Sequence, residues 1–403
     1  MNNRVLVVSF AVICSFLILG VAVYATLRLQ DTAPCINSAL VVPDDFPTIS
    51  DAVGNATEGD TIFVKKGTYE ISEYSVEINK TLSINGEDQA NTILVFPPDT
   101  RTGYELLISK VGFRVNADNF KISNLTIMNC DFGVSVFGNG TEVSNTIMDG
   151  IWLIGSYSKI FDNNITDALT ENNSYTNFFT ITGSYNNISR NSLDNIVDNE
   201  CQGSFNKITE NTIKGDLELK GSSNTITNNS FRTLSLRAAD SNIIQNNTFN
   251  QLSLYNSSNN NIFANTALGP GHSGILMSSG SDNVFYGNCI ADYSSVSTST
   301  GRHSGQGVSI GSKATNNLFY HNNFANNYMN LMYNWNPEMS NINYWDNGTV
   351  GNYWSDYDGI DDDGDGIGDT PHSICYKNVD HYPLMLPFNI ESLNTEFPDE
   401  VFR

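Results

Sequence analysis

The aspartates near the C-terminus form the best candidate for a metal site. From residue 361 the sequence carries Asp at the first, third, fifth and ninth positions and Gly at the sixth, which matches an EF-hand-type calcium loop. Calcium takes about six to eight oxygen ligands, which carboxylates, a backbone carbonyl and water can supply. The predicted calcium ligands are Asp358, Asp361, Asp363, Asp365, Ile367 and Asp369.

The match to a calcium loop is incomplete. His372 stands at the twelfth position in place of the bidentate glutamate, so Asp356 and Asp358 must compensate. A solvated acidic turn is the alternative interpretation. Seven aspartates between 356 and 369 would repel one another without a cation. We therefore expect Ca²⁺, in a structural rather than a catalytic role.

The elements that must position these residues are repeats. One pattern recurs: Asn, an apolar residue two positions on, a second Asn at five and an apolar residue at seven. Copies begin at Ser158, Asn186, Asn206, Asn224, Asn242, Asn260, Asn283 and Asn317. The second asparagines at 191, 211, 229, 247 and 265 are 20, 18, 18 and 18 residues apart. This period with alternating apolar residues predicts short strands that stack as a solenoid.

Among solenoids, the parallel β-helix fits best, because the leucine pattern of leucine-rich repeats is missing. The chain contains 55 asparagines, and we attribute most of them to the turns between strands. Asparagine tolerates left-handed backbone, bonds local backbone groups, and can align its amides into ladders when turns stack.

Both ends of the repeat region carry signals of a cap. Residues 47–53 predict a short amphipathic helix that closes the first coil, and the aromatic residues of 328–357 predict a plug at the other end. If those rings were exposed, they would instead form a sugar-stacking surface. The repeat spacing widens near 170–177 and 292–305, where we expect inserted loops.

Composition excludes two classes of protein. Among 403 residues, 43 acidic and 20 basic side chains give a net charge of -23, which argues against a nucleic-acid partner. A hydrophobic content of 40% with 11% aromatic residues argues against a disordered chain.

The N-terminus predicts export. The uncharged run 5–27 is long for a signal peptide and long enough to cross a bilayer, so a cleaved signal and an uncleaved membrane anchor both remain open. Either one places the body outside the cytoplasm, in an extracellular or cell-surface position. Eleven Asn-x-Ser/Thr sequons are compatible with a glycoprotein. The six cysteines have no metal-ligand spacing, and we expect mainly buried free thiols.

Several segments resemble a known family. Residues 42–49, 58–62 and 66–69 resemble the pectin-lyase-like superfamily, and the repeats resemble the NosD-type β-helix domain. The segments 351–357, 363–371 and 380–385 are similar to archaeal NosD-like surface proteins. The resemblance implies an all-β fold: a right-handed parallel β-helix solenoid with a short N-terminal capping helix and an aromatic, Asp-rich C-terminal cap.

The same resemblance implies two alternative functions, polysaccharide cleavage and copper binding. The superfamily includes polysaccharide lyases and polygalacturonases, and residues 305–312 resemble a polygalacturonase segment in which Gln306 replaces the histidine. No motif pairs acids with the candidate arginines Arg190, Arg232, Arg237 and Arg302. The NosD name implies copper, but no shared ligand spacing connects His272, His303, His321, His372 and His381.

These observations favour a non-catalytic protein that binds a surface polysaccharide or glycoprotein and contains structural calcium. The alternatives are a polysaccharide lyase, epimerase or hydrolase, and a copper-handling accessory protein. An uncleaved N-terminal helix would add the membrane as a partner. The predicted organisation is a signal or anchor at 1–30, a linker at 31–40, a β-helix at 41–328, a cap at 329–390 and a tail at 391–403.

Overall fold

The computed structural model describes residues 39–98, 110–166, 179–194, 199–294, 296–297, 303–333, 342–375 and 378–393. The chain divides into two units, Met1–Ala39 and Leu40–Arg403. The predicted signal or anchor at 1–30 lies outside the described residues, as does most of the tail. Within the described ranges, no helix has the length and apolar character needed to cross a membrane.

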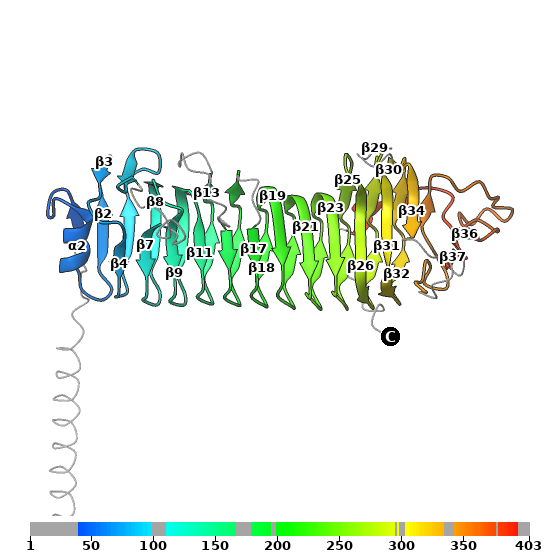
Figure 1. Ribbon diagram of the computed structural model, residues 1–403, viewed down its shortest axis with the longest axis horizontal. Helices are drawn as coiled ribbons and strands as arrows, with labels where there is room; N and C mark the ends of the chain where they lie inside the picture. The colour runs from blue at the N-terminus through cyan, green and yellow to red at the C-terminus, as the bar shows by residue number, and fades with distance from the viewer. Residues whose placement is uncertain are drawn as a thin grey trace, which may run out of the picture. The chain divides into compact units, whose positions relative to one another are not determined.

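Three ladders of parallel strands build the Leu40–Arg403 unit, and successive coils stack along one axis (Figure 1). The first ladder contains β1 Leu40–Val42, β2 Thr61–Val64, β5 Ser83–Gly86, β8 Lys121–Met128, β10 Glu142–Met148, β12 Lys159–Phe161, β15 Asn187–Ser189, β18 Lys207–Thr209, β20 Thr225–Thr227, β22 Ile243–Gln245, β24 Asn261–Phe263, β27 Val284–Tyr286 and β32 Leu318–Tyr320.

The second ladder continues each coil after a bend. It contains β3 Gly67–Glu70, β6 Thr92–Val95, the ends of β8 and β10, β13 Asn164–Ile165, β16 Ser192–Leu193, the beginnings of β19 Thr212–Leu219, β21 Ser230–Arg237 and β23 Thr248–Tyr255, and then β25 Thr266–Leu268, β28 Cys289–Ala291, β33 Asn323–Ala325 and β35 Tyr353–Trp354.

The third ladder completes the coil. It contains β4 Val76–Ile78, β7 Val111–Val115, β9 Phe132–Val136, β11 Ile151–Leu153, β14 Phe179–Ile181, β17 Asn199–Cys201, the ends of β19, β21 and β23, β26 Ser273–Ser281, β31 Gln306–Thr315 and β34 Met329–Tyr333. β34 and β35 thus carry the ladders into the segment that the sequence assigned to the cap.

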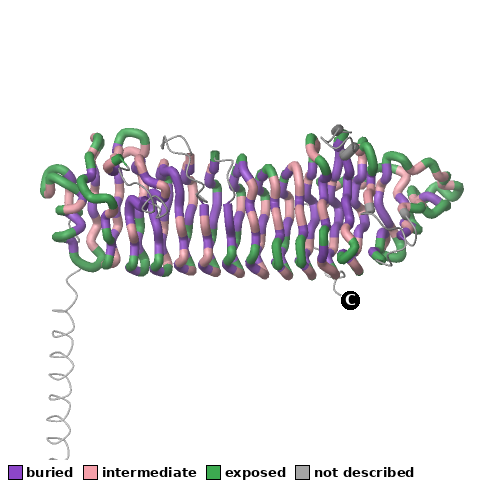
Figure 2. Tube along the Cα trace, viewed as in Figure 1, coloured by how far each residue is buried: buried purple, intermediate pink, exposed green. Residues whose placement is uncertain are grey.

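Alternation of side chains fills the interior. Ile188, Ile208, Ile226 and Ile244 occupy the same register in four consecutive coils, and all are buried. Figure 2 shows buried positions recurring coil after coil along the unit. Each coil can bury its apolar face only against its neighbours, so the repeat and the core are the same feature. The predicted right-handed parallel β-helix is confirmed.

Two ladders of buried asparagines run inside the corners on either side of the first strand ladder. In each, the backbone N–H of one residue donates to the side-chain Oδ1 of the next coil's residue at 2.8–3.1 Å. One ladder is Asn186, Asn206, Asn224, Asn242, Asn260, Asn283, Asn317, Asn343 and Asn378. The other is Asn163, Asn191, Asn211, Asn229, Asn247, Asn265, Asn288, Asn322 and Asn352. The predicted amide ladders are therefore present.

The explanation by left-handed backbone needs correction. The residue with positive φ stands immediately before the ladder asparagine, as at Arg190 (φ 54°), Glu210 (φ 57°) and Ala264 (φ 54°). Asparagine occupies that left-handed position in only some coils, such as Asn228 and Asn246. The ladder asparagines are selected instead for their buried amides, which satisfy backbone groups that the bend leaves outside the strand ladders.

Both ends of the β-helix are capped. The helix α2 Ile49–Asn55 begins after Thr48, whose hydroxyl accepts the Asp51 N–H at 3.0 Å, and it buries Ile49 and Val53. At the other end, Trp345 and Trp354 are almost fully buried and stack on phenylalanine rings of the last coils at 4.4 Å. These rings plug the coil, as the capping interpretation predicts.

Asp380 ends the second asparagine ladder. This residue lies in β37 Asn378–Asp380, which pairs with β36 His372–Cys375. Its carboxylate accepts hydrogen bonds from the Asn352 N–H and the Trp354 indole N–H, both at 2.8 Å. Burial raises the pKa of Asp380 to about 6, although these donors act in the opposite direction.

Candidate functional site

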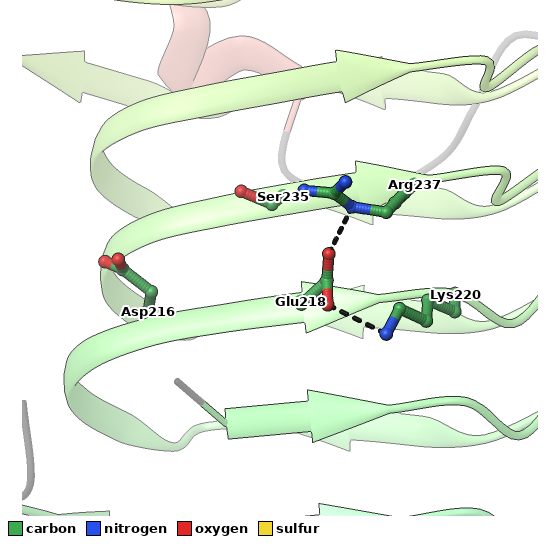
Figure 3. Close-up of a pocket in the computed structure, with 5 residues that line it drawn as sticks. All are labelled: Asp216, Glu218, Lys220, Ser235 and Arg237. Carbon is green, nitrogen blue, oxygen red and sulfur yellow. Dashed lines mark ion pairs between the residues drawn. The ribbon is translucent and has the colours of Figure 1, made fainter. Parts of the chain in front are cut away.

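A groove lined mainly by charged side chains lies on the third ladder, in the coils of β19 and β21. Its volume is about 370 Å³, and it is open to solvent. Alternation along the strands turns Leu217, Leu219 and Leu236 into the core and their polar neighbours outward. The groove is lined by Asp216, Glu218, Lys220, Ser235 and Arg237 (Figure 3).

Glu218 holds the centre of the groove. Its carboxylate pairs with Arg237 of the next coil and with Lys220 Nζ at 3.0 Å, as the dashed lines in Figure 3 show. Lys220 also pairs with Glu200, which lies beside Glu218 in register on β17 and is mostly buried. Arg237 extends over the ring of Tyr255 at 5.7 Å. The network thus links three consecutive coils.

A second ion pair borders the groove. The Arg232 guanidinium donates two hydrogen bonds to the Asp216 carboxylate, both at 2.8 Å. Bidentate pairs of this kind fix the orientation of both groups. Lys220, Arg232 and Arg237 are therefore all engaged with carboxylates.

The charges of the groove reinforce one another. Hydrogen bonds to Glu200 and then Glu218 raise the pKa of Lys220, so its ammonium form is favoured. Desolvation acts to raise the pKa of Glu200, but hydrogen bonds with Lys220 and Gln202 outweigh it and leave the pKa below its ordinary value. These shifts favour the ammonium form of Lys220 and the carboxylate form of Glu200.

The sequence singled out Arg232 and Arg237 as candidates but did not identify the carboxylates that pair with them. The structure pairs Arg190 with Asp162, Arg232 with Asp216 and Arg237 with Glu218, across 28, 16 and 19 residues. These separations differ because a register shift follows Ile213 and because coils differ in length. Aligning the coils on their asparagines pairs Arg190 with Asp162, because Asn163 and Asn191 are also 28 residues apart. The same alignment does not pair the groups of the groove, because Asn211 and Asn229 are 18 residues apart and a register shift follows Ile213. Arg302 lies outside the described residues.

The loops expected to carry function are described only in part. Residues 170–177 lie outside the described ranges. In the other loop, β29 Val296–Ser297 and β30 His303–Ser304 form an antiparallel pair separate from the main ladders. Gln306, which stands where a polygalacturonase would have histidine, is buried at the start of β31 and hydrogen-bonds with Ser273 at 3.0 Å.

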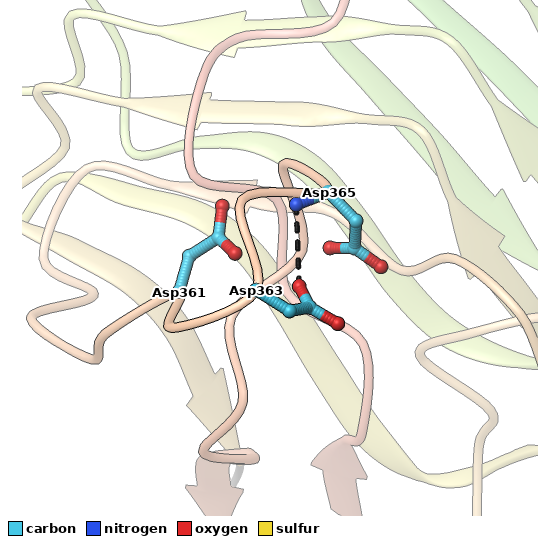
Figure 4. A group of neighbouring side chains, drawn as sticks. All are labelled: Asp361, Asp363 and Asp365. Carbon is cyan, nitrogen blue, oxygen red and sulfur yellow. Dashed lines mark hydrogen bonds between the residues drawn. The ribbon is translucent and has the colours of Figure 1, made fainter.

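The acidic loop brings three of the predicted calcium ligands together. Carboxylate oxygens of Asp361, Asp363 and Asp365 all lie within 4.8 Å of one another (Figure 4). Asp358 and Asp369 do not join this group, and Asp369 instead accepts the Asp362 N–H at 2.6 Å. The loop therefore supplies a compact trio of carboxylates at its exposed tip.

Backbone donors shape this trio. The Asp361 carboxylate accepts the N–H groups of Gly364 at 2.7 Å and Gly366 at 3.0 Å, both at positive φ. Desolvation acts to raise the pKa of Asp361, but the donors Gly366 and Gly364 outweigh it and lower the pKa. Ile367 forms an antiparallel bridge with Leu384, which ties the loop to the end of the cap. Three clustered carboxylates fit the oxygen donors that calcium prefers.

The histidines occupy separate places. His321 stacks on Phe388 at 4.2 Å, His372 lies beside Trp354, and His381 Nδ1 is 2.9 Å from Asp346. In the part of the chain that the structure describes, the aspartate trio is the one group of three or more potential metal-ligating side chains. Cys130, Cys201 and Cys289 are free thiols.

The sequence of the central repeats matches a known family. Residues 203–359 match the family described as "Periplasmic copper-binding protein (NosD)". The matched segment includes every residue that lines the groove. A periplasmic family agrees with the prediction of an exported protein. A comparison with curated protein sequences gives no match.

Solved structures are similar to this chain at low sequence identity, and the first of them shares the fold. The family 6 alginate lyase AlyGC is 14% identical with a TM-score of 0.51, over 78% of this chain and 51% of the lyase. The A-module of the mannuronan C-5 epimerase AlgE4 from Azotobacter vinelandii is 12% identical with a TM-score of 0.44, over 70% of this chain and 91% of the module. The chain thus spans about half of the lyase.

Fold and repeats together define the class of protein. The chain is a parallel β-helix protein, and its residues 203–359 match the NosD family model. The predicted family resemblance is confirmed at this level. One fold of this kind hosts many functions, so activity must be argued from the site.

Proposed function

We propose that this chain is an exported, surface-displayed protein that binds a polysaccharide in the groove on its third ladder. One observation carries the proposal: the groove of about 370 Å³ is lined by ionised side chains fixed by mutual ion pairs. Ligand sites are usually concave and mostly apolar with a few convergent polar groups, whereas this groove is lined by polar side chains throughout. Hydroxyl-rich ligands match such a surface, because each sugar hydroxyl both donates and accepts hydrogen bonds.

The electrostatics favour binding over proton abstraction. A lysine that acts as a general base must be neutral at the working pH. Its hydrogen bonds with Glu200 and Glu218 raise the pKa of Lys220 and favour the charged form. The arginine side chains remain protonated at any physiological pH. Lys220 and Arg237 are thus suited to donate hydrogen bonds to a glycan.

A lyase, epimerase or hydrolase is the second candidate. The observation in its favour is that Asp216, Glu218, Lys220 and Arg237 share one exposed wall, where carboxylates and cations could act on a bound sugar. The alginate lyase named above has the same fold. The likeness is too low in sequence identity to transfer that activity.

Binding is tested with a panel of neutral and acidic polysaccharides, with and without calcium. We expect Arg237→Gln and Glu218→Gln to lower the affinity for a bound glycan about tenfold, since each removes a charged hydrogen-bonding partner. Lys65→Gln is the matched control, because Lys65 forms an exposed ion pair with Asp44 in the first coils, on different strands from the groove. Equal affinities in all three variants would contradict the proposed site.

Turnover decides between the two candidates. Release of new reducing or unsaturated ends by the wild type, lost in Glu218→Gln, would replace binding by catalysis. Binding without release of chain ends and without a change in the uronate composition of the glycan supports the first proposal. A panel on which nothing binds contradicts both.

We also propose that Ca²⁺ binds to Asp361, Asp363 and Asp365, with the Ile367 carbonyl as a further ligand. The compact carboxylate trio supports this proposal. The role would be structural, because the loop is anchored at Leu384 in the cap and lies on different coils from the groove.

A further inference from the structure

Three aromatic side chains form an exposed row at the corner between the third and first ladders. The rings of Tyr157, Tyr185 and Phe205 stack with centroid distances of 5.1 and 4.9 Å and interplanar angles of 6° and 5°. Their exposed fractions are 66%, 50% and 53%. The row spans three consecutive coils and stands outside the core.

The backbone at this corner is unfavourable for such residues. Tyr157, Tyr185 and Phe205 have φ of 59°, 61° and 58°, where bulky side chains are rare. Later coils place small or polar residues at the same corner, again at positive φ: Ser223, Ser241, Asn259, Asp282 and Asn316. The fold therefore does not require aromatic rings here. Strain that the fold does not require points to a function.

Neighbouring coils are in close contact at this corner. The Ser184 N–H donates to Ser156 Oγ and the Ser204 N–H to Ser184 Oγ, both at 3.0 Å. A Cβ at Gly203 would lie 1.7 Å from the Gly183 carbonyl oxygen, so the coils meet backbone to backbone. Rings that stack on one another above this backbone lose little conformational entropy when a ligand binds.

Two lysines flank the aromatic row. Lys159 and Lys207 open β12 and β18 two residues after Tyr157 and Phe205, and Asn187 stands between them in register. Both lysines are exposed, and among the described residues neither has a carboxylate within 4.0 Å. With coils about 4.8 Å apart, the two positions are about 10 Å apart along the axis. Glu142 stands in register beside Lys159 on β10 but forms no ion pair with it among the described residues, so this surface presents two unpaired ammonium groups in a chain of net charge -23.

We propose that Tyr157, Tyr185, Phe205, Lys159 and Lys207 form a second binding surface, the corner stripe, for an acidic polysaccharide that carries carboxylate or sulfate groups. The rings pack against the apolar C–H faces of the sugars, and the ammonium groups pair with the acidic substituents. The corner stripe differs from the groove, where every cation is already paired.

The test uses a polyuronate and a sulfated glycosaminoglycan as acidic probes and dextran as the neutral probe. The aromatic variant combines Tyr157→Ser, Tyr185→Ser and Phe205→Ser, which copies the residue found in later coils and so preserves the turn. The lysine variant combines Lys159→Gln and Lys207→Gln, both at exposed positions. Lys313→Gln, an exposed lysine on β31, is the control.

We expect the wild type to bind an acidic probe with an affinity that falls as salt rises, because the contact depends on charge. Either multiple variant should lose at least tenfold in affinity, whereas Lys313→Gln should bind the acidic probe as the wild type does. Loss in Arg237→Gln alone would assign acidic glycans to the groove and overturn the corner stripe.

Other outcomes also overturn the proposal. These are wild-type affinity in both the aromatic and the lysine variants, equal binding of dextran without salt dependence, or tighter binding of single-stranded DNA than of either acidic probe. Thermal unfolding of each variant shows whether a loss comes from misfolding. The lysine variant decides the matter if the aromatic variant is unstable.

Discussion

Removing one amide from the buried asparagine ladder should destabilise the β-helix far more than its size suggests. Asn229 lies in the middle of the ladder and is 3% exposed. Its Oδ1 accepts the backbone N–H and the side-chain N–H of Asn211, both at 2.9 Å, and its Nδ2 donates to the Ile208 carbonyl at 2.9 Å. Asn229→Ala removes all of these contacts at once.

The magnitude follows from the groups left behind. The Asn211 backbone N–H loses its acceptor inside the protein, which costs about 1–3 kcal/mol. The other lost hydrogen bonds add about 1–2 kcal/mol in total. We therefore expect Asn229→Ala to lower the free energy of unfolding by about 2–5 kcal/mol. Asn229→Leu, which restores most of the volume, should remain destabilised because it restores no hydrogen bond.

Urea unfolding followed by far-UV circular dichroism measures the effect. The matched control is Asn228→Gly, because Asn228 is the adjacent asparagine, is exposed and has φ of 58°, where glycine is unstrained. It should change the stability by less than about 1 kcal/mol. If Asn229→Ala unfolds at the same urea concentration as Asn228→Gly, the ladder does not contribute as we argue.

Two further predictions concern the cap. Calcium should raise the melting temperature and EDTA should lower it; Asp363→Asn should abolish this response, and Asp362→Asn, outside the carboxylate trio, should retain it. An unchanged melting temperature in EDTA would refute a structural calcium site. The folded pKa of Asp380, about 6, exceeds its ordinary value of 3.8, so its protonated form favours folding below pH 3.8 and this contribution is lost as pH rises through 6. Relative to Asp380→Asn, the wild type should lose about 3 kcal/mol between pH 3 and 7 in urea unfolding series; parallel pH profiles would contradict a raised pKa.

The asparagines in the turns between strands were predicted in part from the sequence. The repeated asparagines predicted stacked turns and amide ladders, and both are present. The sequence did not show which asparagines adopt left-handed backbone, because the position in the turn between two strands decides this. The ladder residue Asn191 is buried and follows the left-handed Arg190, whereas Asn228 occupies the left-handed position itself.

The sequence predicted some of the residues that form the candidate calcium site. Asp361, Asp363 and Asp365 are close in sequence, so a short loop with flexible glycines brings them together. Asp358 and Asp369 do not join them, since the loop's own backbone hydrogen bonds engage Asp369. The spacing in the sequence thus predicted the three clustered carboxylates, but it did not show that Asp358 and Asp369 lie outside the cluster.

The sequence by itself determined the class of fold. Apolar alternation and an asparagine repeat of about 18 residues can be satisfied only by coils that stack on one another. Only the tertiary structure decided which polar side chains share a surface. Glu200, Glu218 and Arg237 come from three coils, and ladder register rather than sequence distance makes them neighbours. Because inserted loops and a register shift alter the separation from coil to coil, no fixed spacing in the sequence reveals such a groove.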